Sequence, residues 1–561
     1  MTRIIAANIT SPLGMTAQDS YRAVRSGKTA LSVKTAFMGV PGRMCVAGFS
    51  PEQDNELSVS GLTRFQSLVY RSVSDALSRC DAEPGSPRTI FILSTTKADV
   101  ACLAASKEND GEYLSPGESA RKVARLLGFV NDPLVVCNAC ISGVTAQILA
   151  DRLIRAGYYD TAVVCGADSL SPFTLAGFGS FKALSPKPCR PYDIERLGLN
   201  LGEGAATVVM REATKGWGIL SGALDNDAYH VSAPSPSGEG IARVVAKAVD
   251  EAGSPDIATV TAHGTATMFN DQMESKAIES CGLSAIPVTA YKGCFGHTLG
   301  AAGLIESIVT MMSLDEGVII PVKGYSECGV SGKINVTTRE LETAGRAFLK
   351  MISGFGGCNG ALVYSRSEAE DRLVRRASAE TVHRVRITPS SLEKDGETIV
   401  VTEHGKSLVT EIYKRFLDDN PKFYKMDLFS RLALVAAGML IKEDGASRYG
   451  EETALVLFNR TSSVLADRAH LQTFTGSEGF FPSPSVFLYT LPNVVMGEIA
   501  VRYGIKGETT LVILPGKDQA AMDRIVDSTL SQTGFSKVIT GWVDCADEDG
   551  FEADMKMIFK K

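Results

Sequence analysis

The stretch PLVVCNACISGVTAQILADRLIR, residues 133–155, decides how the first part of this chain folds. Its opening run, 133–137, is short and apolar, which predicts a buried strand. After Cys140 the apolar residues recur at helical spacing, which predicts a helix. Cys140 is therefore expected at a strand-to-helix turn, on the positive end of a buried helix. The partial charge there favours the thiolate and predicts a depressed pKa for a reactive cysteine. The alternative is a buried structural thiol.

Two of the six histidines lie in glycine-flanked turns far from Cys140 in the sequence. They are His263 in HGTAT, 263–267, and His297 in KGCFGHTLG, 292–300. One thiol and two imidazoles supply what carbon–carbon bond formation on a thioester requires: a nucleophile that carries an acyl group, and two donors for a developing enolate. The other histidines match no motif, and a surface or core position is expected for them: His230, His383, His404 and His470.

The composition is that of an ordinary globular protein. The chain has 561 residues, of which 44% are hydrophobic and 22% charged, and its formal net charge is −7. This length allows more than one core, and the charge does not support nucleic-acid binding. No run approaches the ~20 apolar residues of a membrane span, and the N-terminal residues read as a strand and turn rather than a signal segment. The 12 cysteines form no ladder of zinc-binding pairs, so no metal is expected, and a reducing cytoplasm fits.

The motifs around these residues resemble those of the elongating β-ketoacyl-acyl-carrier-protein synthases, within the thiolase-like superfamily. The resemblance runs from about residue 1 to 365. Its segments occur in the family's order: ACISG (139–143), RPYD (190–193) with GEGA (202–205), AHGTAT (262–267), GHTLGAAG (296–303) and GFGGCN (354–359). Two histidines argue against the initiating synthases, which pair one histidine with an asparagine. Thiolases use a second catalytic cysteine, for which no motif is present.

The resemblance implies a role for each residue of the reaction centre. Cys140 would take the growing acyl chain from a carrier protein as a thioester. His263 and His297, as neutral Nε2 donors, would hydrogen-bond the malonyl thioester oxygen during decarboxylation. The backbone N–H groups of Cys140 and Phe355 would form the oxyanion hole, and Phe355 would also be a mobile aromatic gate.

Further residues are implied to bind the substrate or to support the centre. Thr265 and Thr267 would bind the pantetheine arm. Lys292 and Glu306 resemble the family's buried charged pair, which orients the histidines. The remaining expected supports are structural: Asp271, Glu274 and Asn359.

Two positions depart from the family's pattern. Ala266 stands where the family usually has glycine, and Cys358 where it usually has threonine. Both exchanges are between small residues, so neither removes a catalytic group, although both can alter how the pantetheine arm or acyl chain sits.

The fold implied is α/β: a thiolase-like layered αβαβα arrangement of two related halves, with two mainly parallel sheets and helices between and outside them. The β-ketoacyl synthase domain is expected over 1–365, with a nucleophile half of about 1–215 and a histidine half of about 216–365. A charged linker is expected over 366–380. Local patterns predict these elements: strands at 90–93, 162–165 and 206–210, and a helix over 120–127.

Residues 381–561 are predicted to form a C-terminal α/β half-domain that resembles the N-terminal half. The segments 483–493 and 499–507 resemble the family's sequence just upstream of the nucleophile, and this alignment puts Gly516 where the cysteine should be. The half-domain therefore reads as a degenerate half-synthase without its nucleophile. It is expected to dock on its own synthase domain or on a partner synthase, through strands 161–168 and 537–544.

The expected function is decarboxylative Claisen condensation of an acyl thioester on Cys140 with malonyl-carrier protein, in fatty-acid or polyene/polyketide-type chain elongation. The alternative is a non-catalytic subunit like a chain-length factor, but such subunits lack the cysteine that is present here. The expected partner is acyl carrier protein, which brings the phosphopantetheine, so no cofactor of the chain's own is expected. A homodimer or an internal pseudo-dimer is expected, with a partner synthase as a further possibility.

Overall fold

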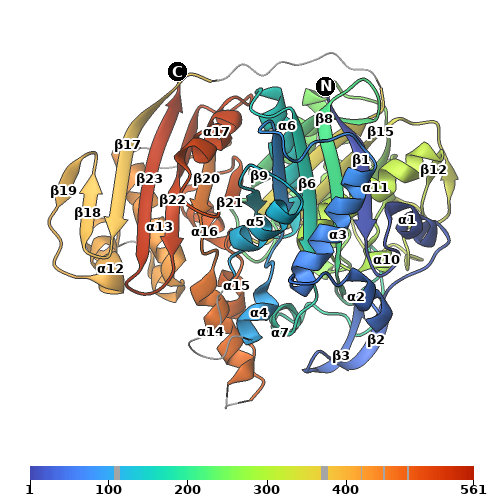
Figure 1. Cartoon of the computed structure of the whole chain (residues 1–561), viewed down its shortest axis with the longest axis horizontal. Helices are drawn as coiled ribbons and strands as arrows, with labels where there is room; N and C mark the ends of the chain where they lie inside the picture. The colour runs from blue at the N-terminus through green and yellow to red at the C-terminus, as the bar shows by residue number, and fades with distance from the viewer. Residues whose placement is uncertain (106–113, 368–376, 419, 446–448, 477–478) are drawn as a thin grey trace.

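The computed structural model describes these parts of the chain: residues 1–105, 114–367, 377–418, 420–445, 449–476 and 479–561 (Figure 1). Its first sheet has the strand order β5 (Leu134–Val136), β4 (Thr89–Ser94), β6 (Thr161–Asp168), β8 (Gly204–Glu212) and β1 (Thr2–Thr10). β5, β4 and β6 are parallel, whereas β8 and β1 continue the sheet antiparallel. β4, β5 and β6 are buried along their whole length, as expected for strands covered by helices on both faces.

The second sheet repeats this pattern. Its order is β11 (Pro287–Thr289), β10 (Ile257–Thr261), β15 (Ala347–Gly354), β16 (Cys358–Ser365) and β9 (Trp217–Asn226). Again three strands are parallel and the last two antiparallel. The sheets are therefore mixed rather than mainly parallel, because each unit returns through two antiparallel strands. A short strand, β13 (Asn335–Val336), extends the parallel edge.

The third sheet belongs to the appended part of the chain. Its order is β21 (Thr509–Ile513), β20 (Thr453–Asn459), β22 (Lys537–Cys545), β23 (Phe551–Lys560) and β17 (Ala379–Thr388). Two further strands extend it beyond β17: β18 (Ser391–Lys394) and β19 (Glu397–Ile399). In Figure 1 these strands, coloured orange to red, lie to one side of the other two sheets.

The same strand order thus occurs three times. Numbering the five main strands of each sheet along the chain, the order is third, second, fourth, fifth, first. We call the three repeats the first unit (1–216), the second unit (217–365) and the third unit (379–561). The repetition in the first two units agrees with the two related halves that the sequence predicts.

The sheet registers relate the third unit to the first. The fourth residue of β4 pairs with Leu134, and the fourth residue of β20 pairs with Thr510. Six residues beyond Leu134 is Cys140, and six beyond Thr510 is Gly516. Counted from these registers, Gly516 has the place in the third unit that Cys140 has in the first.

The first and third sheets join edge to edge through β5 and β21. Val136 pairs with Val512 and Val135 with Ile513, antiparallel. The prediction that 161–168 and 537–544 form this edge is wrong. These strands are β6 and β22, and each lies inside its sheet between two neighbours. The sequence could not reveal this, because β5 is only three residues long and its edge position depends on strand order.

Three helices form the layer that the sheets enclose. They are α6 (Ser142–Arg155), α11 (Ala302–Asp315) and α17 (Gln519–Leu530). α6 is buried from Ser142 to Ile154, as expected for a helix that is apolar on most of its circumference. Side chains of all three helices share one hydrophobic cluster, so the third unit packs against the same inner core as the other two.

Outer helices cover the first and third sheets. α3 (Arg64–Ser78) and α5 (Pro116–Leu126) begin at the capping boxes of Thr63 and Ser115. α13 (Leu428–Asp444) begins at the N-cap Asp427, and α16 (Val494–Tyr503) lies beside it. These helices contribute to a second hydrophobic cluster that is continuous across the two units.

The remaining elements flank these layers: α1 (Ala17–Arg25), β2 (Ser32–Phe37), β3 (Val40–Ala47), α2 (Pro51–Leu57), α4 (Val100–Ala105), α7 (Pro172–Ser180), β7 (Leu201–Gly202), α8 (Glu239–Glu251), α9 (Met268–Ser280), α10 (Lys292–Phe295), β12 (Val318–Ile319), β14 (Leu341–Glu342), α12 (Gly405–Phe416), α14 (Val464–Thr475) and α15 (Pro484–Tyr489).

The predicted strands at 90–93, 162–165 and 206–210 lie within β4, β6 and β8, and the predicted helix at 120–127 corresponds to α5. Most of the predicted linker, 368–376, lies outside the described residues, and its last two residues already belong to β17.

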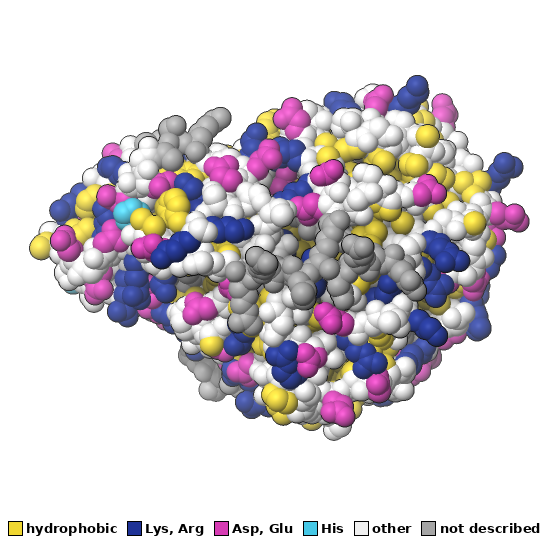
Figure 2. Space-filling view, turned by 90° about the horizontal axis from the view of Figure 1, so that it is seen from above, with side chains coloured by type: hydrophobic (Ala, Val, Ile, Leu, Met, Phe, Trp, Pro, Cys, Tyr) yellow, Lys and Arg dark blue, Asp and Glu magenta, His cyan; other side chains and the backbone are white. Residues whose placement is uncertain are grey.

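The surface carries both signs of charge. Lys and Arg side chains are interspersed with Asp and Glu over the face seen in Figure 2, in keeping with a net charge of only −7. Among the described helices, none is long and apolar enough to cross a bilayer.

Candidate active site

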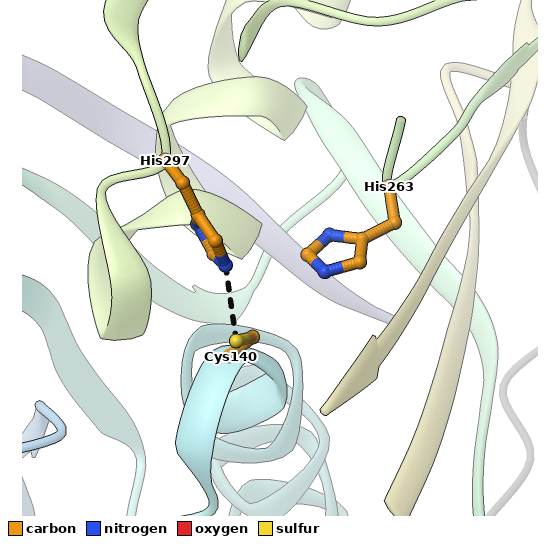
Figure 3. Close-up of side chains that lie close together, drawn as sticks. All are labelled: Cys140, His263 and His297. Carbon is orange, nitrogen blue, oxygen red and sulfur yellow. Dashed lines mark hydrogen bonds between the residues drawn. The ribbon is translucent and has the colours of Figure 1, made fainter. Parts of the chain in front are cut away.

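Cys140 lies on the turn between β5 and α6, as the sequence predicts. It is the middle residue of a 3₁₀ turn, η1 (Ala139–Ile141), and α6 begins two residues later. Ala139 has a φ of +48°, which L residues rarely adopt, so the chain turns sharply just before the thiol. Figure 3 shows the cysteine at the end of α6, facing two histidines.

The electrostatic setting of this thiol differs from the prediction. Burial raises the pKa of Cys140 to about 12, although the nearby Lys292 ammonium lowers it. The predicted depression of its pKa is therefore wrong, because the loss of water around a side chain that is 8% exposed outweighs the helix end. The thiolate has to be stabilised by a specific hydrogen-bond donor instead.

His297 supplies a nitrogen at hydrogen-bond distance. Its Nε2 lies 3.0 Å from Cys140 Sγ (Figure 3). Its Nδ1 accepts a hydrogen bond from the backbone N–H of Leu299 at 3.2 Å. A neutral imidazole whose Nδ1 accepts must carry its proton on Nε2, so His297 presents an N–H toward the thiol.

His263 is held in the same tautomer by a different partner. Lys292 Nζ lies 3.1 Å from its Nδ1 and 2.6 Å from its carbonyl oxygen. Since an ammonium can only donate, Nδ1 of His263 accepts and its Nε2 carries the proton. The two rings are 5.1 Å apart, centroid to centroid, and nearly perpendicular.

Both imidazoles are kept neutral. Burial first, and then the Lys292 ammonium, hold the pKa of His263 and of His297 well below 6.5. Cys140 Sγ and one ring nitrogen of each histidine lie within 4.8 Å of one another. A cysteine and two histidines could bind a metal ion, but here both Nε2 atoms carry protons, so the set is arranged to donate hydrogen bonds.

A buried charge cluster stands behind the histidines. Glu306 Oε1 lies 2.6 Å from Lys292 Nζ, and its Oε2 lies 2.6 Å from Lys350 Nζ. Lys350 also donates to the carbonyl oxygen of Ala262, next to His263, at 3.2 Å. Sequence reasoning found the Lys292–Glu306 pair but missed Lys350. The available signal was a single lysine inside the apolar strand AFLKMISG, β15.

Asp271 and Glu274 brace the loop that carries His263. Glu274 accepts hydrogen bonds from the backbone N–H groups of His263 and Gly264, and Asp271 accepts from that of Ala266 at 3.1 Å. Ala266 is fully buried with a φ of +61°. The glycine that the family usually has would adopt this conformation without strain.

A cavity of about 350 Å³ opens onto the three side chains. Thr265 and Thr267 line it, with their hydroxyl oxygens 2.9 Å apart, and Phe355 lines it as well. His230 also lines the cavity, a position that sequence reasoning did not expect because no motif contains it. His470, in contrast, is buried in the third unit beside Phe173.

The loop between β15 and β16 backs onto the nucleophile. A Cβ atom on Gly354 would lie 3.3 Å from the backbone nitrogen of Cys140. The loop then turns through Gly356 and Gly357, with φ values of +90° and +73°. Asn359 anchors its far end, donating to Asp227 and accepting from the Ser353 hydroxyl, both at 2.7 Å.

The third unit also reaches the site. A small cavity of about 10 Å³ is lined by Cys140 and Phe355 and, from the third unit, by Phe487 and Leu491. Lys97, which also lines it, forms a buried ion pair with Asp467 of the third unit. The sequence did not predict these contacts, since they depend on how two units 300 residues apart pack.

Comparison with known families fits this geometry. Residues 63–216 match the family described as "Beta-ketoacyl synthase, N-terminal domain", and 218–326 match "Beta-ketoacyl synthase, C-terminal domain". Together these matches cover just under half of the chain, so residues 63–326 resemble the two domains of a β-ketoacyl synthase, within a mixed α/β fold.

Curated relatives carry corresponding names. The chain is 35% identical over 257 residues to "3-oxoacyl-[acyl-carrier-protein] synthase 2" of Rhizobium meliloti (strain 1021), an alignment that covers 41% of this chain and 60% of the relative. It is 34% identical over 281 residues to the "Tetracenomycin polyketide synthase ketoacyl synthase alpha subunit" of Streptomyces glaucescens, covering 46% and 65%. The chain therefore spans less than two thirds of either relative's length.

A solved structure aligns with the whole length of the chain. "PfaC Keto synthase-Chain length factor" aligns with 100% of this chain and 78% of its own length, with a TM-score of 0.75 and 15% identity. At this identity the likeness concerns the fold alone, and it includes the third unit.

Proposed function

We propose that this chain is a β-ketoacyl-acyl-carrier-protein synthase, which condenses an acyl group on Cys140 with a malonyl thioester. The observation that carries the proposal is the convergence of one buried thiol and two neutral imidazoles with Nε2–H groups on a single cavity. A nucleophile and a pair of aimed donors are what this chemistry requires.

In the first step Cys140 Sγ attacks the acyl thioester carbonyl. The bond from the carbonyl carbon to the carrier thiol breaks, and that thiol leaves with the proton that Cys140 loses. The Nε2–H group of His297, 3.0 Å away, stabilises the sulfur as it gains negative charge. The backbone N–H groups of Cys140 and Phe355 would hold the carbonyl oxygen, which is consistent with the close approach of Gly354 to Cys140.

In the second step a malonyl thioester occupies the same cavity. Its carboxylate leaves as carbon dioxide, and the electron pair of the broken bond forms an enolate. The Nε2–H groups of His263 and His297 donate to the thioester oxygen as it gains charge. The enolate carbon then attacks the Cys140 thioester, and the carbon–sulfur bond breaks to give a 3-oxoacyl thioester as product. The Cys140 sulfur leaves as a thiolate, which takes a proton from the solvent to restore the thiol. Thr265 and Thr267 line the route for the pantetheine arm.

The alternative of a chain-length-factor-like subunit is less well supported. Such a subunit would need no nucleophile, whereas here Cys140, His263 and His297 are all present and mutually oriented. The pathway is open between fatty-acid and polyketide-type elongation. The carrier protein supplies the phosphopantetheine, so the chain's own residues need only bind the arm. A cytoplasmic location stays a prediction.

The third unit is proposed to be a degenerate half-synthase docked on its own synthase domain. Its repeated strand order, the place of Gly516 and the β5–β21 pairing support this interpretation. It would fill the position of a dimer partner from within the chain, which makes a pseudo-dimeric monomer the expected form in solution.

Two substitutions test the proposed chemistry. Cys140→Ala should abolish condensation but leave malonyl decarboxylation measurable, because the histidines stabilise the enolate. His297→Ala should still allow acylation of Cys140 but slow decarboxylation on the order of 100- to 1000-fold. Intact-protein mass spectrometry follows acylation, and carbon dioxide release follows decarboxylation.

The control is His383→Ala, on β17 of the third unit. It should leave both rates unchanged. Ketoacyl product from Cys140→Ala at the wild-type rate would refute the nucleophile assignment. A folded His297→Ala protein that no longer accepts an acyl group would refute the division of labour between thiol and histidines.

A further inference from the structure

One side chain of the third unit contacts the loop that carries Phe355. Asn493, at the start of α16, donates through Nδ2 to the carbonyl oxygen of Phe355 at 2.7 Å and approaches Cys358 Sγ at 3.7 Å. Asn493 is 2% exposed, and its Oδ1 is buried without a partner among the described residues. Within the described part of the chain, the Asn493 side chain therefore forms its hydrogen bonds with this loop and with Cys358, which directly follows it.

The helix behind Asn493 is shaped to approach the loop closely. Gly497, one turn further along α16, has no side chain, and a Cβ atom there would lie 2.5 Å from the carbonyl oxygen of Gly356. A second asparagine, Asn226, donates to that same oxygen at 2.8 Å and to the hydroxyl of Thr509 in β21 at 3.2 Å. The carbonyls of Phe355 and Gly356 are thus both held by asparagine side chains.

The third unit also holds the segment just before the nucleophile. Asn138 donates to the carbonyl oxygen of Thr509 and accepts from the backbone N–H of Leu511, both at 2.9 Å. The backbone N–H of Cys137 donates to the carbonyl oxygen of Leu511 at 3.1 Å. The third unit therefore contacts both backbone segments, 137–138 and 355–356, that flank the N–H groups of the proposed oxyanion hole.

The first unit lacks these features at the corresponding positions. Residues 116–140 align without a gap on 492–516, in the register that the two sheets define. Asn493 then corresponds to Gly117, and Gly497 to Arg121, which pairs with Asp132 near the surface. Within the described residues no counterpart of the second unit packs against Gly117, which faces the backbone of Leu514 and Pro515 instead of such a loop. At these two aligned positions, the asparagine and the glycine are present in the third unit, which faces the loop, and absent from the first unit.

From this asymmetry we infer that Asn493 is a positioning residue for acyl transfer, which holds the Phe355 loop so that its backbone N–H faces the thioester on Cys140. The inference rests on the proposed function and extends it: the third unit completes the reaction centre as well as covering a sheet edge. Displacement of the loop should weaken stabilisation of the oxyanion and leave the thiol itself intact.

The test compares two reactions of the same sulfur in the full-length chain. Acyl transfer from an acyl-N-acetylcysteamine thioester forms an oxyanion, whereas alkylation by iodoacetamide does not. The thioester is chosen from an acetyl-to-dodecanoyl series as the one that acylates the wild type fastest. Asn493→Leu keeps the size of the side chain and removes the donor. Gly497→Ala displaces the loop by a different route.

We expect both variants to acylate Cys140 on the order of 10- to 100-fold more slowly than the wild type, with alkylation changed less than about threefold. Asn493→Ser retains a short donor and should recover part of the acyl-transfer rate. The matched control is Asn459→Leu, which removes another buried asparagine of the third unit, one that donates to Ser462. It should change neither rate.

Three results would count against these ideas. Wild-type acyl transfer in both Asn493→Leu and Gly497→Ala would overturn the inference. Equal loss of acyl transfer and alkylation would also overturn it, because it would mean that Asn493 only supports the fold. If the wild type were alkylated but never acylated by any thioester of the series, the proposed function would fail, and the inference would fall with it.

Discussion

Replacing Lys350 by methionine should shift the pKa values of His263 and His297 with little change in the free energy of unfolding. Lys292, Glu306 and Lys350 form a buried cluster with two positive charges and one negative charge. Lys350→Met reduces the net charge of the cluster from +1 to 0 while keeping a chain of similar length. Lys292 still pairs with Glu306 and still holds Nδ1 of His263, so the tautomers should persist.

The expected change is an upward shift of the pKa values of both histidines. Lys350 is one of the charges that lower them, after burial and Lys292. For scale, a unit charge at about 7 Å in a medium of effective dielectric constant about 20 would be worth roughly 2 kcal/mol, or about 1–2 pKa units. The acid limb of malonyl decarboxylation should therefore move to higher pH by about 1–2 units. A protonated histidine carries a proton on Nδ1, so Nδ1 can no longer accept the hydrogen bond that orients the ring.

The substitution should also affect the free energy of unfolding, by an amount that depends on pH. Burial lowers the pKa of Lys350, so its charge is held against a desolvation cost. Its replacement should therefore alter the free energy of unfolding by less than about 2 kcal/mol at pH 7. A histidine whose folded-state pKa is depressed contributes stability that is present above about pH 6.5 and lost as pH falls. Raising these pKa values should make the variant lose less stability between pH 6.5 and 4.5 than the wild type loses.

The measurements are carbon dioxide release from a malonyl thioester across pH and denaturant unfolding at the same pH values. The control is Lys537→Met, which removes a largely buried lysine paired with Asp444 in the third unit. It should leave the acid limb in place. A Lys350→Met profile that coincides with the wild type, or shifts to lower pH, would refute the role assigned to this charge.

Two further substitutions probe the packing around the site. Phe487 is 1% exposed and contacts the rings of Phe178, Phe181 and His470. Phe487→Ala should cost about 3–5 kcal/mol of stability and extend the small cavity beside Cys140. Mass spectrometry should then find longer acyl chains on Cys140, and an unchanged chain-length distribution would contradict this. Ala266→Gly should raise the melting temperature. It relieves about 1–2 kcal/mol of strain from the left-handed backbone conformation, which exceeds the roughly 0.4–1 kcal/mol by which the added glycine entropy stabilises the unfolded chain. A lower melting temperature in calorimetry would show that the loop tolerates alanine without strain.

Much of the site could be recognised from sequence because its parts are local. The strand, turn and helix around Cys140 follow from apolar periodicity over about 20 residues. His263 and His297 stand out because they lie in short glycine-containing turns. The Lys292–Glu306 ion pair followed from the resemblance, and its two members meet at 2.6 Å.

Other features required the fold, since they depend on residues that no motif joins. Lys350 acts on the site only because β15 lies beside β10. The pKa of Cys140 follows from burial, which local sequence does not report, and its predicted direction was wrong for that reason. The edge strand was misassigned because strand order depends on packing of whole units.

The sequence alone predicted which side chains carry the proposed chemistry and that a half-domain resembling the first unit follows residue 365, since motif spacing and periodicity are properties of neighbouring residues. Only the tertiary structure decided where that half goes. The pairing of β5 with β21 brings Asn493, Phe487 and Asp467 to the site, although each lies more than 300 residues beyond Cys140 in the sequence. Such contacts depend on the order of the strands in the sheets and on core packing, because all three units have to bury their apolar faces in the same structure.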